Sequence, residues 1–282
     1  PFNFQRKLTN DDAQEGYMWE SPDFFPLGEH RYLMYSPQGM KAEGYAYRNR
    51  FQSGVLRGYW QPETVFKRTG VFEELDHGHD FYAPQSFLTA DGRRVILGWM
   101  DMWESPMPSK QEGWAGSFTL PRELIECHGK LYQRPVRELE SLRQQPQLIE
   151  PATMTDPFLI TPCADAVELE ICWDTARSQA EQYGVRLGEG LQLYVDSQAK
   201  RLVLWRRYLH EGIDGYRSIA LPPSEQVKIR MFIDRSSVEV FVNDGEACMT
   251  SRIYPQPEQR ALTLYSSQGE AVMLGGSLWR LE

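Results

Sequence analysis

Long apolar runs, paired cysteines and excess positive charge are all missing from this 282-residue sequence. No run approaches the roughly 20 apolar residues that a membrane-spanning helix needs, and nothing at the start is typical of a cleavable signal. The cysteines form no CxxC pair, which argues against a metal cluster and a dense disulfide framework. They are Cys127, Cys163, Cys172 and Cys248. We therefore expect a cytoplasmic protein with free thiols, no metal and no membrane partner.

Basic residues are the minority, 30 against 39 acidic residues, and the net charge is −9. This balance repels phosphate backbones and anionic membrane surfaces, so it argues against nucleic acid as a partner. The length and the 41% hydrophobic content are sufficient for a sizeable core in one or two domains.

Helical periodicity is also scarce, whereas apolar and polar residues alternate with a period of two at many places. In the first half, short runs such as 32–35 and 94–99 are separated by turn signals, among them Ser36-Pro37-Gln38-Gly39 and Asp91-Gly92. Short strands with aromatic-rich connections are typical of propeller blades or barrels. The sequence therefore predicts an all-β protein.

The pattern changes near residue 140, where Val136, Leu139 and Leu142 recur at helical spacing before regularity ends. We place the domain boundary here, with residues 1–142 as the first domain, 143–150 as a linker and 151–282 as the second domain.

The second domain shows the clearest strands. Residues 167–173, 227–233 and 238–242 alternate so that one face of each strand is apolar. Asn243-Asp244-Gly245 follows the third strand, and these residue types tolerate the positive φ that hairpin turns require. We expect a β-sandwich of two packed antiparallel sheets.

The best catalytic candidate is Glu20, in the stretch Trp19-Glu20-Ser21-Pro22-Asp23. A carboxylic acid that protonates an ether-like bond at neutral pH needs a raised pKa, and a neighbouring indole can raise it by excluding water from the charged form. The alternative is that Glu20 and Asp23 only flank a turn before the strand at 32–35.

Several stretches, in order along nearly the whole chain, resemble the signatures of the β-fructofuranosidases of glycoside hydrolase family 32, the invertase and sucrose-6-phosphate hydrolase group. The stretch around Glu20 resembles the family's Trp-Glu-Cys-Pro-Asp motif, with Ser21 in place of the cysteine. Other family signatures are resembled by residues 78–85, 96–100, 114–116 and 120–124, and residues 233–245 resemble the signature of the family's C-terminal β-sandwich.

The resemblance implies a five-bladed β-propeller whose funnel holds the active site, followed by the β-sandwich. It implies retaining hydrolysis of sucrose, sucrose 6-phosphate or a related β-fructofuranoside, with Glu20 as the general acid/base and no cofactor. The family's nucleophile lies in a Trp-Met-Asn-Asp-Pro-Asn-Gly motif and its transition-state stabiliser in an Arg-Asp-Pro motif, and this sequence contains neither.

We therefore expect the C-terminal portion of such an enzyme, a partial propeller that is inactive alone and whose partner is the missing N-terminal propeller segment. If the chain alone were active, Asp80 or Asp101 would be the candidate nucleophile.

The resemblance also implies that Asp80 and Tyr82 line the substrate funnel, whereas Asp80 taken alone resembles a turn residue. Trp99 and Trp19 are candidates for stacking on a sugar, although a tryptophan that follows aliphatic residues is often part of the core. Asp101 either contacts a sugar hydroxyl or caps a turn.

Four further polar residues are weaker candidates for a catalytic or metal-binding role. His77 and His79 lack the signal of a third metal ligand, so we expect them to support the Asp80 loop. Asp234 and Glu239 border the sandwich signature, and we expect both to be solvated.

Two other classes of function stay open. One is a noncatalytic carbohydrate-binding β-sandwich module with degenerate propeller blades, and the other is a structural or interaction protein. A binding module has no need of an acid/base signature, which is why the hydrolase is our first hypothesis.

Overall fold

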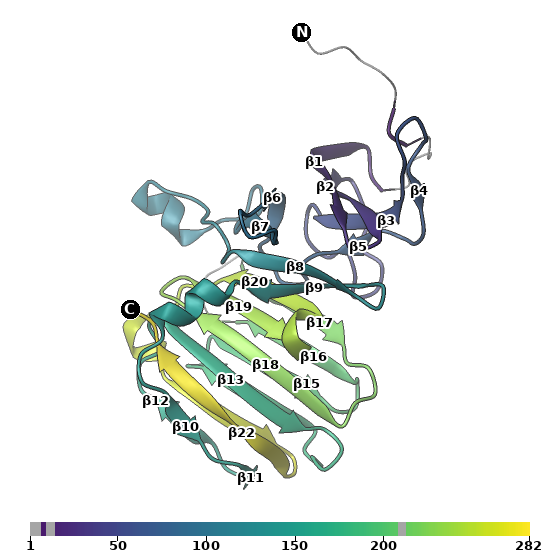
Figure 1. The fold of residues 1–282 in the computed structure, drawn as a ribbon. Coiled ribbons are helices and arrows are strands. Elements are labelled where there is room, and N and C mark those ends of the chain that lie inside the picture. Colours follow the sequence, from purple (N-terminus) through teal and green to yellow (C-terminus); the bar gives the residue numbers. More distant parts are fainter. Residues whose placement is uncertain (1–6, 10–14, 208–212) are drawn as a thin grey trace.

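The computed structural model describes residues 7–9, 15–207 and 213–282, and these residues form four β-sheets. Two small sheets build the upper part of the molecule in Figure 1, and two larger sheets build the lower part. We call the described residues up to 135 the blade region and residues 143–282 the sandwich. The all-β prediction is confirmed.

The first sheet of the blade region has the strand order β1-β2-β3-β4, and β5 also pairs with β3. Its central strand β2 is buried on both faces: Tyr32 and Met34 contact one hydrophobic cluster, and Leu33 and Tyr35 contact another. Successive strand residues point to opposite faces, so one strand serves both clusters. The strands are β1 (Met18–Leu27), β2 (His30–Gln38), β3 (Gly54–Tyr59), β4 (Lys67–Arg68) and β5 (Glu73–Glu74).

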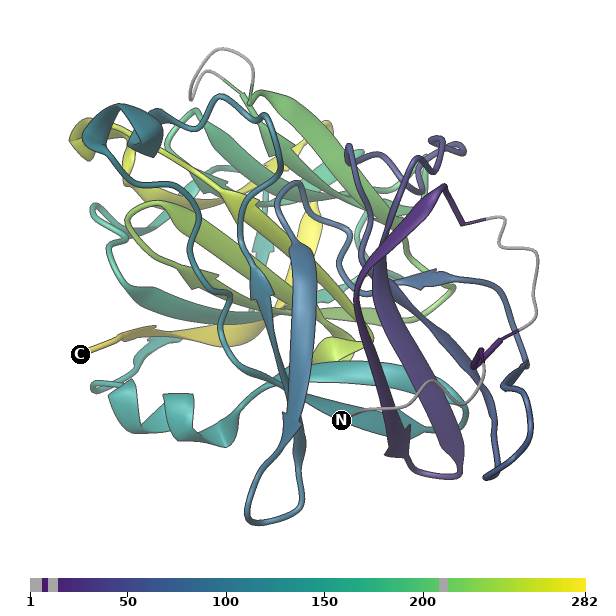
Figure 2. The same ribbon diagram turned by 90° about the horizontal axis from the view of Figure 1, so that it is seen from above.

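The second sheet of the blade region is an antiparallel meander in the order β6-β7-β8-β9. Phe81, Ile96 and Leu124 from this part of the chain pack into the same cluster as Tyr32 and Met34. Figure 2 shows the two sheets side by side when the molecule is seen from above. The elements are β6 (Tyr82–Leu88), β7 (Arg94–Trp99), the 3₁₀ helix η1 (Pro108–Glu112), β8 (Arg122–Cys127) and β9 (Lys130–Pro135).

The predicted helical stretch near residue 140 is a short 3₁₀ helix, η2 (Arg137–Leu142). The prediction that residues 143–150 form a linker is wrong, because part of this stretch belongs to the sandwich. Its strand β10 (Gln147–Ile149) pairs with β22 (Ala271–Arg280). Arg143 forms an isolated bridge with Leu281. The Nη2 atom of Arg143 also lies 2.5 Å from Oε1 of Glu168.

The sandwich follows the prediction closely. The residues read as strands at 167–173, 227–233 and 238–242 lie in β13, β18 and β19, which are neighbours in one sheet. That sheet has the order β10-β22-β13-β18-β19-β20, with β11 also paired to β22. The bounds not yet given are β11 (Ala152–Met154), β13 (Val167–Asp174), β18 (Gln226–Ile233), β19 (Ser237–Val242) and β20 (Ala247–Arg252).

The second sheet of the sandwich has the order β12-β21-β14-β15-β16-β17. One hydrophobic cluster with residues from both sheets, including Trp173 and Leu193, fills the space between them. The predicted hairpin turn is confirmed, since Asn243, Asp244 and Gly245 all have positive φ. The strands are β12 (Phe158–Thr161), β14 (Gln182–Leu187), β15 (Leu191–Asp196), β16 (Arg201–Arg206), β17 (Gly215–Ala220) and β21 (Leu262–Ser267), and two 3₁₀ turns are η3 (Asn243–Gly245) and η4 (Pro257–Gln259).

A buried ion-pair network joins the blade region to the sandwich. The guanidinium of Arg122, on β8, donates to Asp76 Oδ2 at 2.9 Å and to Glu239 Oε2, on β19, at 2.7 Å. Asp76 Oδ2 also accepts from Thr250 Oγ1, on β20, at 2.6 Å. The prediction that Glu239 is solvated is wrong: the residue is 3% exposed, and burial raises the pKa of its carboxyl.

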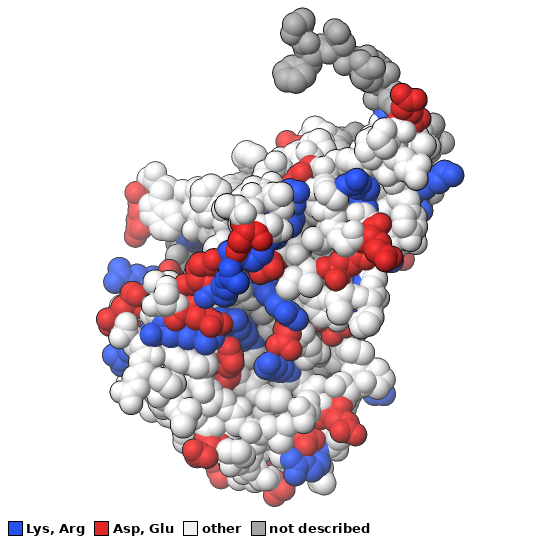
Figure 3. Space-filling model, viewed as in Figure 1, with Lys and Arg blue, Asp and Glu red and all other residues white. Residues whose placement is uncertain are grey.

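Further charge pairs lie on the surface around this junction. Figure 3 shows basic and acidic side chains interleaved in a band across the middle of the molecule. Lys130 Nζ lies 2.6 Å from Glu246 Oε1, and Lys228 Nζ lies 2.8 Å from Asp244 Oδ1. Exposed pairs of this kind contribute little each, so the buried network around Arg122 dominates the junction.

Candidate active site

A bulge in the first strand sets the position of Glu20. Glu20 pairs with Ser36 on β2, whereas the next registered pair is Asp23 with Met34, so the ladder is irregular between Glu20 and Asp23. Ser21 has a φ of 50°, in the left-handed region. A bulge changes the direction of the side chains beside it, and here it separates the carboxyl of Glu20 from that of Asp23.

One carboxylate oxygen of Glu20 accepts two hydrogen bonds. The phenol of Tyr82 donates to Oε2 at 2.5 Å, and the amide Nε2 of Gln38 donates to the same oxygen at 3.0 Å. Gln38 Nε2 also lies 3.2 Å from the Tyr82 oxygen. Burial raises the pKa of the Tyr82 phenol, with the hydrogen bond to Glu20 as the next cause, so the phenol keeps its proton and donates.

Tyr82 comes from the other sheet of the blade region, at the start of β6. The next residue, Ala83, has a φ of 47°, and the β6–β7 ladder is irregular between Tyr82 and Gln85. The backbone N–H of Ala83 donates to Ser36 Oγ at 3.1 Å, which ties β6 to β2. The structure therefore brings together Glu20 and Tyr82, two residues that the sequence predicted for the site.

The second acid of the motif, Asp23, has a local role. Its Oδ2 accepts from the backbone N–H of Ser86 at 2.9 Å and from the Ser86 hydroxyl at 2.6 Å. Gln85 Nε2 donates to the carbonyl oxygen of Ser21 at 2.9 Å. These bonds fix the bulge after Glu20 against β6.

Trp19 lies on the opposite face of β1 from Glu20. Its ring stacks on Tyr35 with centroids 4.0 Å apart, and its Nε1 donates to the carbonyl oxygen of Glu15 at 2.9 Å. The sequence reasoning assumed that the indole shields Glu20 from water, and this is wrong because neighbouring strand residues point in opposite directions. A contact between Trp19 and a sugar stays a prediction.

Asp80 lies at the junction with the sandwich. Its Oδ2 accepts from Arg206 Nη1 at 2.6 Å and from the backbone N–H of Arg252 at 2.7 Å, and the residue is 1% exposed. Both partners belong to the sandwich. The structure therefore does not give Asp80 the predicted place in an open funnel, since its carboxyl is occupied by the domain contact.

The neighbouring histidines lie at the same junction, and the backbone N–H of His77 donates to the carbonyl oxygen of Cys248 at 2.8 Å. His79 Nδ1 lies 2.8 Å from Ser251 Oγ, and its Nε2 lies 3.1 Å from the carbonyl oxygen of Gly215. Across the described ranges, no group of three or more His, Cys, Asp or Glu residues is arranged to hold a metal ion.

Trp99 ends β7 and is the registered partner of Tyr82. Its ring lies 5.3 Å from that of Trp103, and Gly116 packs so closely on the indole that a Cβ there would be 2.0 Å from Nε1. Asp101 is buried, which raises the pKa of its carboxyl, and its Oδ1 accepts from the backbone N–H of Met102 at 2.7 Å. Trp99 as a stacking surface stays a prediction, and Asp101 caps a turn.

Sequence reasoning missed Gln38. The stretch Ser36-Pro37-Gln38-Gly39 was interpreted as a turn, but β2 continues through Gln38 before turning at Gly39, whose φ is 94°. No signal in the sequence marks Gln38, because its closeness to Glu20 depends on the pairing of β1 with β2.

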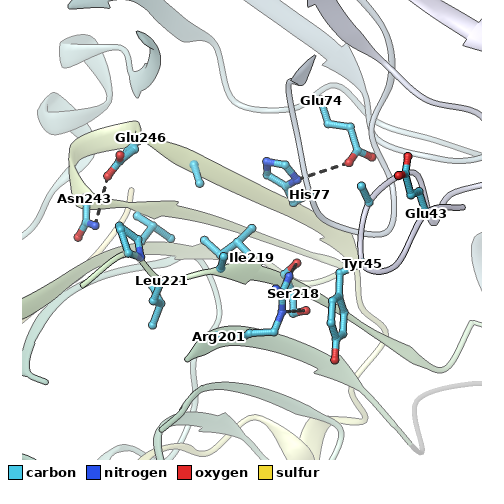
Figure 4. Close-up of a pocket in the computed structure, with 15 residues that line it drawn as sticks. Glu43, Tyr45, Glu74, His77, Arg201, Ser218, Ile219, Leu221, Asn243 and Glu246 are labelled. Atoms are coloured by element: carbon cyan, nitrogen blue, oxygen red, sulfur yellow. Dashed lines mark hydrogen bonds and ion pairs between the residues drawn. The ribbon is translucent and has the colours of Figure 1, made fainter. Parts of the chain in front are cut away.

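A separate cavity of about 500 Å³ lies between the blade region and the sandwich (Figure 4). Glu74 and His77 line it from above, and Arg201 and Ser218 line it from below. Burial raises the pKa of Glu74 to about 7, although its carboxylate accepts from the backbone N–H of Tyr47. Burial lowers the pKa of His77, whose Nδ1 lies 3.8 Å from Glu74 Oε2. None of these residues contacts Glu20.

The helices among the described residues are short 3₁₀ turns, and none of them could span a membrane.

Comparison with protein families gives two matches that together span almost the whole chain. Residues 1–135 match "Glycosyl hydrolases family 32 N-terminal domain", and residues 138–280 match "Glycosyl hydrolases family 32 C terminal". The boundary between them coincides with the passage from β9 to η2.

Curated relatives agree with the family matches. A sucrose-6-phosphate hydrolase of Escherichia coli is 61% identical over 280 residues, which is 99% of this chain and 59% of that protein. A raffinose invertase of the same species is 56% identical over the same shares. The chain therefore spans about three fifths of the length of these relatives.

Solved structures show the same architecture. The β-fructofuranosidase BmSUC1 of Bombyx mori superposes with a TM-score of 0.79 at 29% identity, covering 98% of this chain and 56% of the other. A sucrose-6-phosphate hydrolase from Lactobacillus gasseri has the same fold, with a TM-score of 0.82 at 24% identity over 98% of this chain and 57% of the other. The prediction of a partial propeller followed by a β-sandwich is confirmed.

Proposed function

The chain belongs to glycoside hydrolase family 32, and from that premise we propose that it carries the acid/base side of a retaining β-fructofuranosidase site, with Glu20 as the proton donor. The observation that carries the proposal is the pair of donors on Glu20 Oε2, the Tyr82 phenol and the Gln38 amide. A carboxyl used twice, first as acid and then as base, needs a fixed position in both states.

The chemistry proceeds in two steps. In the first, the Glu20 carboxyl gives its proton to the glycosidic oxygen as that oxygen leaves the anomeric carbon of fructose, while a second carboxylate attacks that carbon. In the second, Glu20 takes a proton from water, and the resulting hydroxide equivalent releases fructose from the covalent intermediate. The second carboxylate must lie about 5–5.5 Å from the first in a retaining enzyme.

We propose that this nucleophile comes from a further propeller segment that acts as the partner of the chain. Two observations support the proposal. The sequence has no Asn-Asp-Pro or Arg-Asp-Pro motif. The blade region also exposes large aromatic side chains: Tyr17 is 75% exposed and Phe118 is 76% exposed. Exposed apolar surface of this kind favours contact with another chain segment.

The substrates we propose are sucrose, sucrose 6-phosphate and raffinose, because relatives named for sucrose 6-phosphate and raffinose are 61% and 56% identical to this chain. Trp99 is the proposed sugar contact on this side of the site, because it is the registered partner of Tyr82, whereas Trp19 lies on the opposite face of β1 from Glu20. The catalytic steps use carboxyl groups and water alone, so no cofactor takes part in the proposal, and we place the enzyme in the cytoplasm.

Fructose release tests the proposal. The chain is purified and assayed with sucrose, sucrose 6-phosphate and raffinose, both alone and mixed with the part of the E. coli sucrose-6-phosphate hydrolase that the match leaves uncovered. We expect turnover only in the mixture, because protonation without a nucleophile cannot form the covalent intermediate.

Two outcomes contradict the proposal. Robust turnover by the chain alone would place a nucleophile among its own acids, although Asp80 and Asp101 are each 1% exposed. Sugar binding without turnover in every mixture would favour the noncatalytic carbohydrate-binding module.

A further inference from the structure

We propose that Gln38 is a positioning residue which, together with Tyr82, reserves Oε2 of Glu20 as a hydrogen-bond acceptor, so that the transferred proton travels on Oε1. This inference rests on the proposed role of Glu20 as the acid/base. It assigns the proton to one oxygen of the carboxyl and gives a function to a glutamine outside the acid/base motif.

The two oxygens of the Glu20 carboxyl differ in the hydrogen-bond donors that they face. Oε2 of Glu20 accepts from the Tyr82 phenol at 2.5 Å and from Gln38 Nε2 at 3.0 Å. Within the described part of the chain, no hydrogen bond to Oε1 of Glu20 is found. An oxygen that faces two donor hydrogens has no room for a proton of its own. The proton of the neutral acid therefore belongs on Oε1.

The orientation of the Gln38 amide supports this assignment. The hydroxyl of Tyr17 donates to Gln38 Oε1 at 3.1 Å, which leaves Nε2 to face Glu20 and Tyr82. If the amide were turned over, its carbonyl oxygen would face the carboxylate oxygen of Glu20, and two acceptors would meet without a hydrogen between them. The hydrogen-bond network thus fixes which end of the amide is the donor.

The backbone holds Gln38 firmly. The backbone N–H of Tyr17 donates to the Gln38 carbonyl oxygen at 2.8 Å, and Gln38 forms a β-bridge with Phe51 on its other side. Gly16 has a φ of 75° and lies so close that a Cβ there would be 2.0 Å from the same carbonyl oxygen. Gln38 is only 9% exposed. A residue fixed on both sides in this way can hold its amide in one place through both steps of the reaction.

In the reaction, the two oxygens of the Glu20 carboxyl then have different functions: Oε1 carries the transferred proton, and Oε2 accepts the two hydrogen bonds. In the first step the Oε1–H bond breaks and its proton goes to the leaving glycosidic oxygen, which also keeps the electron pair of the broken carbon–oxygen bond. The anion left on Glu20 is stabilised at Oε2 by two donors. In the second step Oε1 takes a proton from the attacking water.

The first test uses the chain itself and needs no activity. Glutamate side chains are labelled with ¹³C at Cδ, the Glu20 signal is assigned with Glu20→Gln, and its titration is followed by NMR. In Gln38→Met the ionised carboxyl loses one donor, so we expect the titration midpoint to rise by about one pH unit. The control Gln198→Met removes an exposed glutamine of the sandwich and should leave the midpoint unchanged.

A milder variant guards against misfolding. Tyr17→Phe removes the hydroxyl that orients the amide, at a position 75% exposed, so the fold should persist. We expect a smaller shift in the same direction. If neither Gln38→Met nor Tyr17→Phe changes the titration midpoint of Glu20, the inference is overturned.

The second test uses the active mixture. We expect Gln38→Met to lower kcat for sucrose about 10-fold with KM little changed, and to move the alkaline limb of the pH–rate profile upward. An equal loss at every pH would mean that Gln38 has only a structural role. The proposed function fails separately: if Glu20→Gln keeps full activity, Glu20 is not the acid, whatever the titration of the Gln38 variant shows.

Discussion

The two halves of this molecule differ in how they complete their cores. The sandwich packs its two sheets around a single large cluster that includes Trp173 and Leu193. The blade region divides its apolar residues between two smaller clusters on either side of β2, and it contains most of the large hydrophobic side chains that are exposed. The acid/base candidate Glu20 thus lies in the half that has the smaller hydrophobic clusters and more exposed hydrophobic side chains.

The difference shows that the proposed acid/base Glu20 and the largest hydrophobic core lie in different halves of the chain. The sandwich holds the blade region through the Arg122 network and the contact of Asp80 with Arg206. The blade region in turn supplies Glu20, Tyr82 and the bulges that orient them.

The largest effect on folding should come from preparing the blade region and the sandwich as separate chains. We expect residues 143–282 to unfold cooperatively on heating with a β-type circular dichroism spectrum, because their strands pair with one another and share one core. Residues 1–142 alone should be sensitive to protease. The shortened chain begins at Arg143 because β10 belongs to the sandwich sheet. Cooperative unfolding of the isolated blade region would contradict this difference between the two halves.

Arg122→Met should have the next largest effect. It leaves Asp76 and Glu239 buried without their cation, and breaking a buried ion pair in this way costs about 3–5 kcal/mol. The matched control is Arg137→Met, since the Arg137 side chain is 70% exposed and solvent screens its pair with Asp91, so this variant should lose much less stability. Denaturant unfolding measures both variants. Equal effects would mean that the junction does not depend on the buried network.

Three strands of the sandwich, β13, β18 and β19, could be predicted because apolar and polar residues alternate along them in the sequence, even where the polar residues, such as Glu168 and Glu239, are buried. β2 could not be bounded in the same way, since both of its faces are buried and the alternation disappears. The motif at Glu20 and the resemblance to the family named Glu20 and Tyr82, which the structure joins by a hydrogen bond, while a contact of Tyr82 with substrate stays a prediction. They misplaced Asp80, because neighbours in sequence do not reveal which domain a loop side chain faces.

Gln38 was beyond prediction for a related reason. It lies 18 residues from Glu20 in the sequence and reaches it only through the pairing of β1 with β2. The Arg122 network depends likewise on Glu239 and Thr250, which lie more than 100 residues away. Contacts across domains require the fold.

A smaller effect on stability should come from the titration of Glu74, which lines the cavity at the junction. The folded-state pKa of Glu74 is raised to about 7, so the folded protein binds this proton more tightly than the unfolded chain does. The associated stability is present below the ordinary glutamate range and is lost as the pH rises through about 7. The lowered pKa of His77 gives a slope of opposite sign.

Glu74→Gln isolates the carboxyl contribution. Relative to this variant, the wild type should lose about 1–3 kcal/mol of unfolding free energy as the pH rises through that window. Urea unfolding at several pH values measures the difference, with His77→Gln as the companion variant of opposite sign. A difference that stays constant with pH would mean that Glu74 does not titrate near 7.

The most direct test of the account is the kinetics of Glu20→Gln in the active mixture. If Glu20 is the acid/base, sucrose hydrolysis should slow by about 10²–10⁴-fold, the range for removal of a positioned proton donor. The exposed control Glu29→Gln, at the end of the same hairpin, should be unaffected. A fructoside with a good leaving group should keep a fast first step, and azide should partly restore turnover by replacing the water that Glu20 activates. Sucrose hydrolysis by Glu20→Gln within a few-fold of the wild type would contradict the account.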